Sequence, residues 1–263
     1  MSIYSIFTLS IYKVVLTVML VLAVVVFIAL QRFRAGYGYL RNSRWGLEIN
    51  NRVGWMIMEA PVFICMLWLF ILTKSYSNVA VTVMTMLFLI HYFQRSFIFP
   101  LLIRGNSTIP VTIVIMSIIH NLVNVYMQGG WLFFPTVIKP QAYQTSWLWD
   151  PRFIIGTLIF LVGFYNNLKS DYIVRHLRKP GDTQHYIPMG GMFKYVSSAN
   201  YFGELVEWLG FAVLTWSPSG LVFFLFTFAN LVPRSSALYD KYVEEFGDDF
   251  TKLHRKKCIP FIY

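Results

Sequence analysis

The sequence predicts an all-α polytopic membrane protein, a single domain over residues 1–263 with seven helices that cross the bilayer. Hydrophobic residues make up 57% of the chain and charged residues only 13%. Soluble domains of this size do not have such a composition. The apolar runs are also long and continuous, whereas the strands of a membrane β-barrel would show short alternating segments.

A helix needs about 20 mostly apolar residues to cross a bilayer, and the chain holds seven such segments. We expect them at residues 8–30, 54–73, 80–102, 109–127, 153–174, 199–217 and 219–233. The fifth helix is expected to continue beyond the membrane through Arg178. A turn at residues 217–220 separates the last two helices, and the seventh is expected to be short, with Arg234 at its end.

Basic residues are concentrated in alternate loops. The loops after the first, third and fifth helices and the C-terminal tail hold most of them, among them Arg32, Arg34, Arg41, Arg44, Arg52, Arg104, Arg175, Arg178, Lys179 and Lys194. The opposite loops hold only Lys74, Lys139 and Arg152. This bias predicts a cytoplasmic C-terminus and an N-terminus on the other side. It also accounts for the net charge of +10, so we expect no nucleic-acid partner.

Four charged residues lie inside segments that are otherwise apolar enough to cross the membrane: Glu59, Arg95, Glu204 and Glu207. A charge at membrane depth costs several kcal/mol (about 3 or more) and usually marks a functional site. Nearby segments supply polar partners, namely Tyr92, Asn167, Asp171 and Asn200. In the predicted orientation these residues lie in the cytoplasmic half of the bilayer. We interpret them as a membrane-embedded active site; the alternative is a set of structural polar contacts between helices.

Two helices carry polar stripes. The spacing of Asn200, Glu204 and Glu207 places these residues on one helical face. The same geometry groups the stripe of the fifth helix, Asn167, Asp171, Arg175 and Arg178. Two such stripes could form the walls of a site that accepts a long polar ligand from the cytosol. Helices held together by buried hydrogen bonds would show the same pattern.

Several familiar site types are absent from the sequence. The loop at residues 177–191 mixes cations and glycines, which suits phosphate binding, but a cytoplasmic loop also carries cations under the positive-inside rule. No Gly-x-Gly-x-x-Gly fingerprint and no phosphate-binding Gly-x-x-x-x-Gly-Lys motif is present. The five histidines show no metal-ligand spacing, so we expect no metal site.

A series of motifs resembles the steroid 5α-reductase family. The C-terminal half contains Asn167-Leu-Lys-Ser-Asp171-Tyr, Leu177-Arg-Lys-Pro-Gly181, Ile187-Pro-x-Gly-Gly191, Phe193-x-Tyr-Val-Ser-x-Ala-Asn200-Tyr-x-Gly-Glu204-x-x-Glu207-Trp208 and Ile259-Pro-Phe-Ile-Tyr263. The N-terminal half contains Gly36-Tyr37-Gly38, Trp55 followed by Glu59-x-Pro61, and His91-Tyr92-Phe93-x-Arg95. The resemblance covers nearly the whole chain, which we identify as a bacterial or divergent member of the family.

The resemblance implies NADPH-dependent reduction of the Δ4 double bond of a 3-oxosteroid, with hydride transfer to C5. Residues 1–105 would contact the substrate, and residues 106–263 would mainly bind NADPH. By motif, Glu59 and Tyr92 would contact the 3-keto oxygen; Tyr92 can donate a hydrogen bond, and Glu59 can donate one only when protonated. The cofactor residues implied by the family are Asn167, Asp171, Arg178, Asn200, Glu204, Arg234 and Tyr242, with Arg95 and Arg104 beside them. Either Arg104 or Arg178 would meet the 2′-phosphate.

The sequence departs from the family pattern at three places. Met58 precedes Glu59, where animal members often carry glutamine. The stretch from Arg234 to Tyr242 lacks the histidines that are common there, and His185 stands where a tyrosine often lies. These departures bear on nicotinamide contacts and substrate preference more than on the reaction.

Other readings remain open. A long-chain enoyl-CoA reductase would share the chemistry, and a membrane methyltransferase of similar fold would use S-adenosylmethionine. A receptor or a sterol-binding protein would share the topology without the catalysis. We expect a monomer surrounded by membrane lipid. The host membrane would be the inner membrane of a bacterium or the endoplasmic reticulum of a eukaryote, with the cofactor site facing the cytosol.

Overall fold

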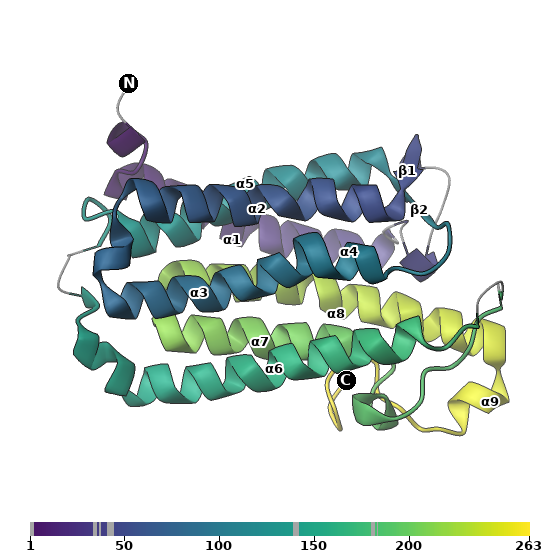
Figure 1. The fold of residues 1–263 in the computed structure, drawn as a ribbon. Helices are drawn as coiled ribbons and strands as arrows, with labels where there is room; N and C mark the ends of the chain where they lie inside the picture. The colour runs from purple at the N-terminus through teal and green to yellow at the C-terminus, as the bar shows by residue number, and fades with distance from the viewer. Residues whose placement is uncertain are drawn as a thin grey trace.

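In the computed structural model the chain forms a bundle of roughly parallel and antiparallel helices (Figure 1). The structure describes residues 3–33, 36, 38–40, 45–138, 142–179, 182 and 184–263. Arg34, Tyr37, Arg41, Arg44, Lys139, Pro180 and Gly181, which entered the sequence arguments above, lie outside these residues.

Within the described residues, six helices are long and apolar enough to cross a membrane. They are α1 (Leu9–Arg32), α2 (Asn51–Leu72), the continuous helix Val79–Leu102, α5 (Val111–Phe133), α6 (Pro151–Arg175) and α8 (Pro218–Phe246). The sixth expected segment forms α7 (Ala199–Thr215), which has 17 residues and packs between α6 and α8. Six of the seven expected spans thus meet the length and composition of a membrane helix, and α7 falls just short of that length.

The remaining elements are short. One end of the bundle carries a two-stranded antiparallel sheet, β1 (Glu48–Asn50) with β2 (Thr108–Pro110), in which Ile49 faces Ile109. These strands precede α2 and α5 and hold their starts together, so the fold is mostly helical, as predicted, with two short strands among the described residues. Short helical turns cover Ile3–Ser5, Gly38–Leu40, Ser75–Ser77, Thr145–Trp149 and Gly191–Lys194, and α9 covers Asp248–Thr251.

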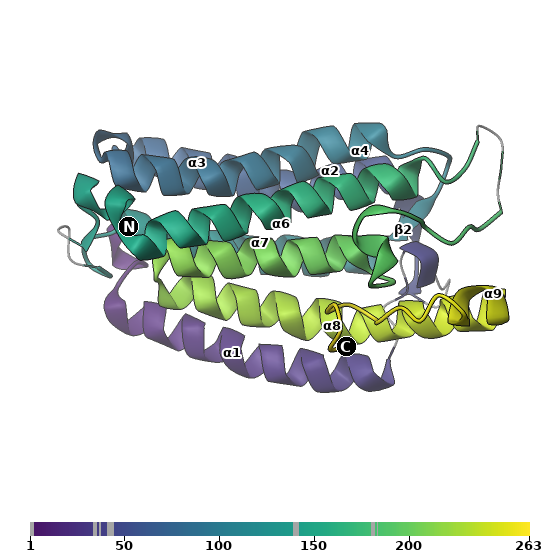
Figure 2. The same ribbon diagram turned by 90° about the horizontal axis from the view of Figure 1, so that it is seen from below.

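The outer surface of the bundle is apolar. Helix α1 lies at the edge against α8 (Figure 2), and its outward residues Val14, Val18, Val21 and Val25 are exposed. A water-facing helix would carry polar residues on this face, whereas lipid tails are the natural neighbours of aliphatic side chains.

Glycines bring α6 and α7 into close contact. A Cβ atom on Gly163 would lie 2.2 Å from the backbone nitrogen of Glu207, and one on Gly203 would lie 2.5 Å from that of Asn167. Gly156 and Gly210, two turns further along, make equally close approaches. Small residues allow two backbones to approach in this way inside a membrane. The polar stripes of the two helices therefore face each other across a narrow gap.

The third membrane helix changes from α-helical to π-helical winding around Arg95. It consists of α3 (Val79–Phe93), a π-helical turn at Gln94–Ile98 and α4 (Phe99–Leu102). The backbone N–H of Phe99 donates to the carbonyl of Gln94, five residues earlier, and Pro100 has no N–H to donate. π-turns inside α-helices are frequent at functional sites. Here the turn holds the buried residues Gln94, Arg95 and Ser96.

Three predicted helix ends are wrong. Helix α5 continues to Phe133, six residues beyond its expected end. Helix α8 passes through Pro233 and ends at Phe246, so Arg234 and Tyr242 lie within it. Proline in a helix interior costs about 3 kcal/mol, which the buried packing of α8 against α1 and α7 offsets in the folded protein. Helix α6 ends at Arg175, and the N–H groups of His176 and Leu177 bond to carbonyls three residues back, at Ile173 and Val174, as in a tightened final turn. Arg178 therefore lies beyond the helix and off its polar stripe.

The contact between α6 and α7 yields a stability prediction. Gly163→Val should lower the free energy of unfolding by about 1–3 kcal/mol or more, because the new side chain would overlap the α7 backbone. Thermal unfolding of the detergent-solubilised protein measures this loss. Gly129→Ala is the control, since its Cβ would meet side chains alone, the movable Leu69 at 3.1 Å and the Phe133 ring at 3.5 Å, and no backbone atom of another helix. An unchanged melting temperature for Gly163→Val would contradict the close packing.

Candidate active site

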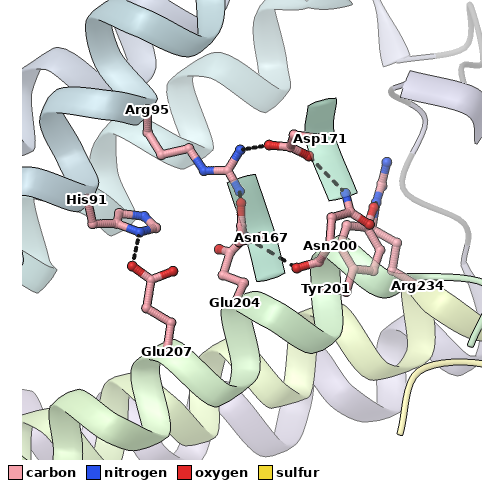
Figure 3. Close-up of polar contacts among 9 residues, drawn as sticks. All are labelled: His91, Arg95, Asn167, Asp171, Asn200, Tyr201, Glu204, Glu207 and Arg234. Atoms are coloured by element: carbon pink, nitrogen blue, oxygen red, sulfur yellow. Dashed lines mark hydrogen bonds and ion pairs between the residues drawn. The ribbon is translucent and has the colours of Figure 1, made fainter. Parts of the chain in front are cut away.

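Arg95 is the centre of a buried polar cluster that joins the π-turn of the third membrane helix to α6 and α7 (Figure 3). Its guanidinium donates to Asp171 Oδ2 at 2.9 Å, to Asn167 Oδ1 at 2.9 Å and to Glu204 Oε2 at 3.0 Å. Asn200 donates to the other oxygen of Asp171 at 3.5 Å, at the limit of a hydrogen bond. We call these five residues the Arg95 cluster.

The surroundings of the Arg95 cluster make its interactions strong. The side chains of Arg95 and Asp171 are 8% and 7% exposed, and that of Glu204 is 24% exposed. The guanidinium also lies over the rings of Phe99 and Trp55, at 5.1 and 5.9 Å from their centroids. One cation thus meets two carboxylates with little water to screen them. The cluster can present amide and carboxylate groups to the hydroxyl or carboxamide groups of a polar ligand.

One turn further into the bundle, His91 Nδ1 lies 2.6 Å from Glu207 Oε1. Glu207 is fully buried, and its second oxygen makes no hydrogen bond among the described residues. Glu207 was expected on the same stripe as Glu204, but the sequence did not point to His91 as its partner. The two glutamates of α7 therefore bind different partners on the third membrane helix (Figure 3).

Glu59 of α2 and Tyr92 of α3 are both hydrogen-bonded to α5. Asn121 Nδ2 lies 3.2 Å from Glu59 Oε2, and Asn124 Nδ2 lies 2.9 Å from Tyr92 Oη. Because Asn121 and Asn124 are one turn apart on α5, their partners are neighbours. Trp55, one turn before Glu59 on α2, lies against the guanidinium of Arg95. The pair therefore borders the Arg95 cluster.

The α5 amides, which we define as Asn121, Asn124 and Gln128, were missed in the sequence. These residues are 4%, 0% and 1% exposed, respectively. The signal was present in their spacing, since three amides recur at intervals of three and four residues in a segment otherwise apolar enough to cross the membrane. Because these three side chains are neutral, they do not stand out in the sequence as charged residues at membrane depth do.

A second group of predicted residues lies at the end of the bundle that carries the sheet. Arg178 is exposed, and Arg104 contacts His176 beyond the end of α6 at 2.9 Å. The Arg234 side chain is buried and donates to Tyr201 Oη at 2.6 Å. The ring of Tyr242 lies 5.2 Å from that of Tyr39. These residues do not join the Arg95 cluster; they form a rim nearer to the water.

Part of this rim is a clasp between three segments, which we define as Tyr39, His185 and Glu245. Glu245 accepts from the Tyr39 hydroxyl and lies 2.7 Å from His185 Nδ1. Partial burial and the Glu245 carboxylate raise the pKa of Tyr39 above its usual range, while Arg178 acts in the opposite direction. His185, one of the departures from the family pattern, thus ties the loop after α6 to the end of α8.

The structure therefore separates the predicted residues by depth. It brings together Glu59, Tyr92 and Arg95 with Asn167, Asp171, Asn200 and Glu204. It places Arg104, Arg178, Arg234 and Tyr242 around the rim, on the side of the cluster where α6 ends.

Comparisons with known proteins agree with the motifs. The sequence model of the 3-oxo-5-alpha-steroid 4-dehydrogenase family matches residues 107–263. The chain is 37% identical over 258 residues to steroid 5-alpha-reductase DET2 of Gossypium hirsutum, covering 97% of this chain and 98% of that protein. It is 40% identical over 243 residues to 3-oxo-5-alpha-steroid 4-dehydrogenase 1 of Mus musculus, covering 92% of each. The human protein of that name is 36% identical over 219 residues, or 82% of each chain.

Similarity of this extent, together with six helices apolar enough to cross a membrane, confirms the resemblance seen in the motifs. The chain is an integral membrane protein that belongs to the steroid 5-alpha-reductase family of oxidoreductases, which act on CH–CH bonds.

Proposed function

We propose that this protein reduces the Δ4 double bond of a 3-oxosteroid to the 5α product with NADPH as the reductant. The observation that carries the proposal is the position of Glu59 of α2 and Tyr92 of α3, which are hydrogen-bonded to neighbouring amides of α5 and border the Arg95 cluster. In this arrangement Glu59 and Tyr92 would each donate a hydrogen bond to an enone carbonyl, and a polar cofactor would bind beside them at the Arg95 cluster. This matches the reaction named for the relatives.

The mechanism assigns a role to each of the two residues. Tyr92 donates its O–H to the 3-keto oxygen, and Glu59 donates when protonated. As C5 is reduced, electron density moves toward this oxygen, so both hydrogen bonds strengthen in the enolate-like transition state. NADPH, when bound, would supply the hydride for C5, and a proton from water would reach C4 to complete the 5α product. The α5 amides hold both donors in place before the substrate arrives, which avoids a reorganisation cost during the reaction.

The chemistry of the described residues fits NADPH. Amides and carboxylates in the Arg95 cluster match a carboxamide and ribose hydroxyls, and the exposed cations Arg104 and Arg178 match phosphates. Ser96, next to Arg95, and Ser198, two residues before Asn200, each have a buried hydroxyl that makes no hydrogen bond among the described residues. Such groups are costly without a polar partner, and a polar ligand at the cluster would supply one.

The proposal extends to the membrane. Helix α7 would be the seventh span, since it packs within the bundle although it has only 17 residues. The basic loops support a cytoplasmic location for the rim and the C-terminus, so the cofactor would enter from the cytosol. We also propose that the protein acts as a monomer.

The first test is turnover. Purified protein in detergent should consume NADPH only when a Δ4-3-oxosteroid such as testosterone or progesterone is present, and mass spectrometry should show a product heavier by two hydrogens. Bound NADPH without steroid turnover would direct the search to an enoyl thioester or another enone. Absence of NADPH binding by folded protein would overturn the proposal.

Variants of the carbonyl donors separate catalysis from cofactor binding. Glu59→Gln and Tyr92→Phe should each lower kcat by about a hundredfold or more, the range for removing a donor from a developing oxyanion. The dissociation constant for NADPH should change little, because neither side chain is expected to contact it. Calorimetric titration with NADPH measures this constant. A loss of NADPH affinity comparable to the loss of kcat would contradict the assigned roles.

The 2′-phosphate contact can be assigned by comparing two cofactors. Arg104→Ala and Arg178→Ala should each weaken NADPH binding if both meet phosphate, by at most about 3 kcal/mol for a charge-assisted contact. Only the residue at the 2′-phosphate should leave NADH binding unchanged. Lys74→Ala, at the opposite end of the bundle, is the control for loss of one positive charge. If neither arginine variant altered NADPH affinity, the phosphate role of the rim would be wrong.

A further inference from the structure

We infer that Asn124 and Gln128 are positioning residues that set the direction of the Tyr92 hydrogen bond, so that its O–H points at the substrate carbonyl. This inference rests on the proposed function of Tyr92. It adds what that proposal leaves open, namely why the phenol should donate toward the substrate rather than toward the protein.

The side-chain amide of Gln128 faces a backbone carbonyl of α8. Gln128 Nε2 lies 3.1 Å from the carbonyl oxygen of Ser219. A carbonyl oxygen can only accept, so the group of Gln128 that faces it must be the NH2. The carbonyl of Ser219 therefore determines which way the Gln128 amide points, although the oxygen and nitrogen of a side-chain amide are similar in shape.

The same nitrogen of Gln128 also lies 3.2 Å from Asn124 Oδ1. With an N–H donor on that side, Asn124 presents its oxygen to Gln128 and its NH2 to Tyr92. Asn124 Nδ2 then donates to Tyr92 Oη at 2.9 Å. Gln128 thus donates both to α8 and to Asn124, and Asn124 donates in turn to the phenol oxygen.

The consequence for Tyr92 follows from what a phenol can do. Its oxygen accepts from Asn124, so its own proton cannot be directed at that amide. The Tyr92 O–H makes no hydrogen bond to any of the described residues, and Tyr92 is 3% exposed. A buried hydroxyl proton without an acceptor is a donor available to a ligand oxygen.

Glu59 is held in a comparable way. Asn121 Nδ2 donates to the backbone carbonyl of Met58 at 2.6 Å, which determines the orientation of that amide as well. The same NH2 meets Glu59 Oε2 at 3.2 Å. Helix α5 therefore offers only N–H donors to both carbonyl-contacting residues, which leaves their own protons for a third group.

Reversing this direction is the test. Asn124→Asp keeps the shape of the side chain but offers the phenol an acceptor, so the new carboxylate should take the Tyr92 proton. We expect kcat to fall about a hundredfold, as far as in Tyr92→Phe, while the dissociation constants for steroid and NADPH change by less than about threefold. Asn124→Leu, which removes the donor without supplying an acceptor, should cost less than Asn124→Asp.

The ordering of the variants distinguishes positioning from mere packing. A packing role predicts that Asn124→Leu, which changes the shape of the side chain, lowers kcat more than Asn124→Asp does. It also predicts that the losses of kcat in Asn124→Asp and Tyr92→Phe multiply in the double variant. A positioning role predicts that the double variant is no worse than Tyr92→Phe alone, since the amide acts through the phenol. Thr85→Val, which removes a buried 2.7 Å hydrogen bond on the same helix as Tyr92, is the control and should retain wild-type kcat.

Infrared difference spectroscopy gives a readout that needs no turnover. With a 3-oxosteroid labelled with ¹⁸O at C3, bound to protein loaded with NADP+, donation from Tyr92 should lower the carbonyl stretching frequency. The frequency should rise equally in Asn124→Asp and Tyr92→Phe and stay unchanged in Thr85→Val. A wild-type frequency in Asn124→Asp would overturn the inference. A wild-type frequency in Tyr92→Phe would instead overturn the proposed role of Tyr92.

A second variant covers the case in which Asn124→Asp does not fold. Gln128→Glu reverses the chain from its far end and places no charge next to Tyr92. The Asn124 amide would then turn its NH2 toward the new acceptor and its oxygen toward the phenol. We expect the same rise in carbonyl frequency and the same non-additivity with Tyr92→Phe. A folded Gln128→Glu protein with wild-type frequency and kcat would contradict the inference.

Discussion

The buried guanidinium of Arg95 is the interaction on which the rest of the site depends. It lies on the third membrane helix and binds side chains of α6 and α7 at 2.9–3.0 Å. Removing one partner of such a pair costs about 3–5 kcal/mol, because the other charge remains buried without compensation. The cluster therefore links the helices that carry Glu59 and Tyr92 to the helices that carry the expected cofactor residues. A single side chain couples the two halves of the proposed reaction.

The local backbone makes this interaction possible. The π-turn at Gln94–Ile98 directs Arg95 into the bundle, and the glycine contacts between α6 and α7 bring Asp171 and Glu204 within reach of the same guanidinium. A wider gap between α6 and α7 would leave two carboxylates too far apart to share one cation. The close contact also aligns Asn167 with Asn200, whose backbone carbonyl accepts from it at 3.3 Å.

Depth in the bundle separates different kinds of chemistry. Neutral amides surround Glu59 and Tyr92, where a steroid carbonyl would be polarised without competition from water. Mixed charges occupy the Arg95 cluster, which suits a polar but uncharged part of a ligand. Exposed arginines and the Tyr39 clasp lie at the rim, where water and loops tolerate phosphate charge. A cofactor that is anionic at one end and neutral at the other matches this gradient.

Much of the fold follows from the sequence alone, because apolar segments of about 20 residues must become helices in a membrane. Six of the expected spans with their approximate bounds, the polar stripes of α6 and α7 and the charges inside apolar segments were all visible in this way. The ends of α6 and α8 were not, since packing and terminal hydrogen bonds decide whether a helix stops at Arg175 or passes through Pro233. The pairing of His91 with Glu207 and the alignment of the α5 amides with Tyr92 also required the structure. Sequence spacing places residues on a face of their own helix, but only tertiary packing decides which face of another helix they meet and in which direction each hydrogen bond runs.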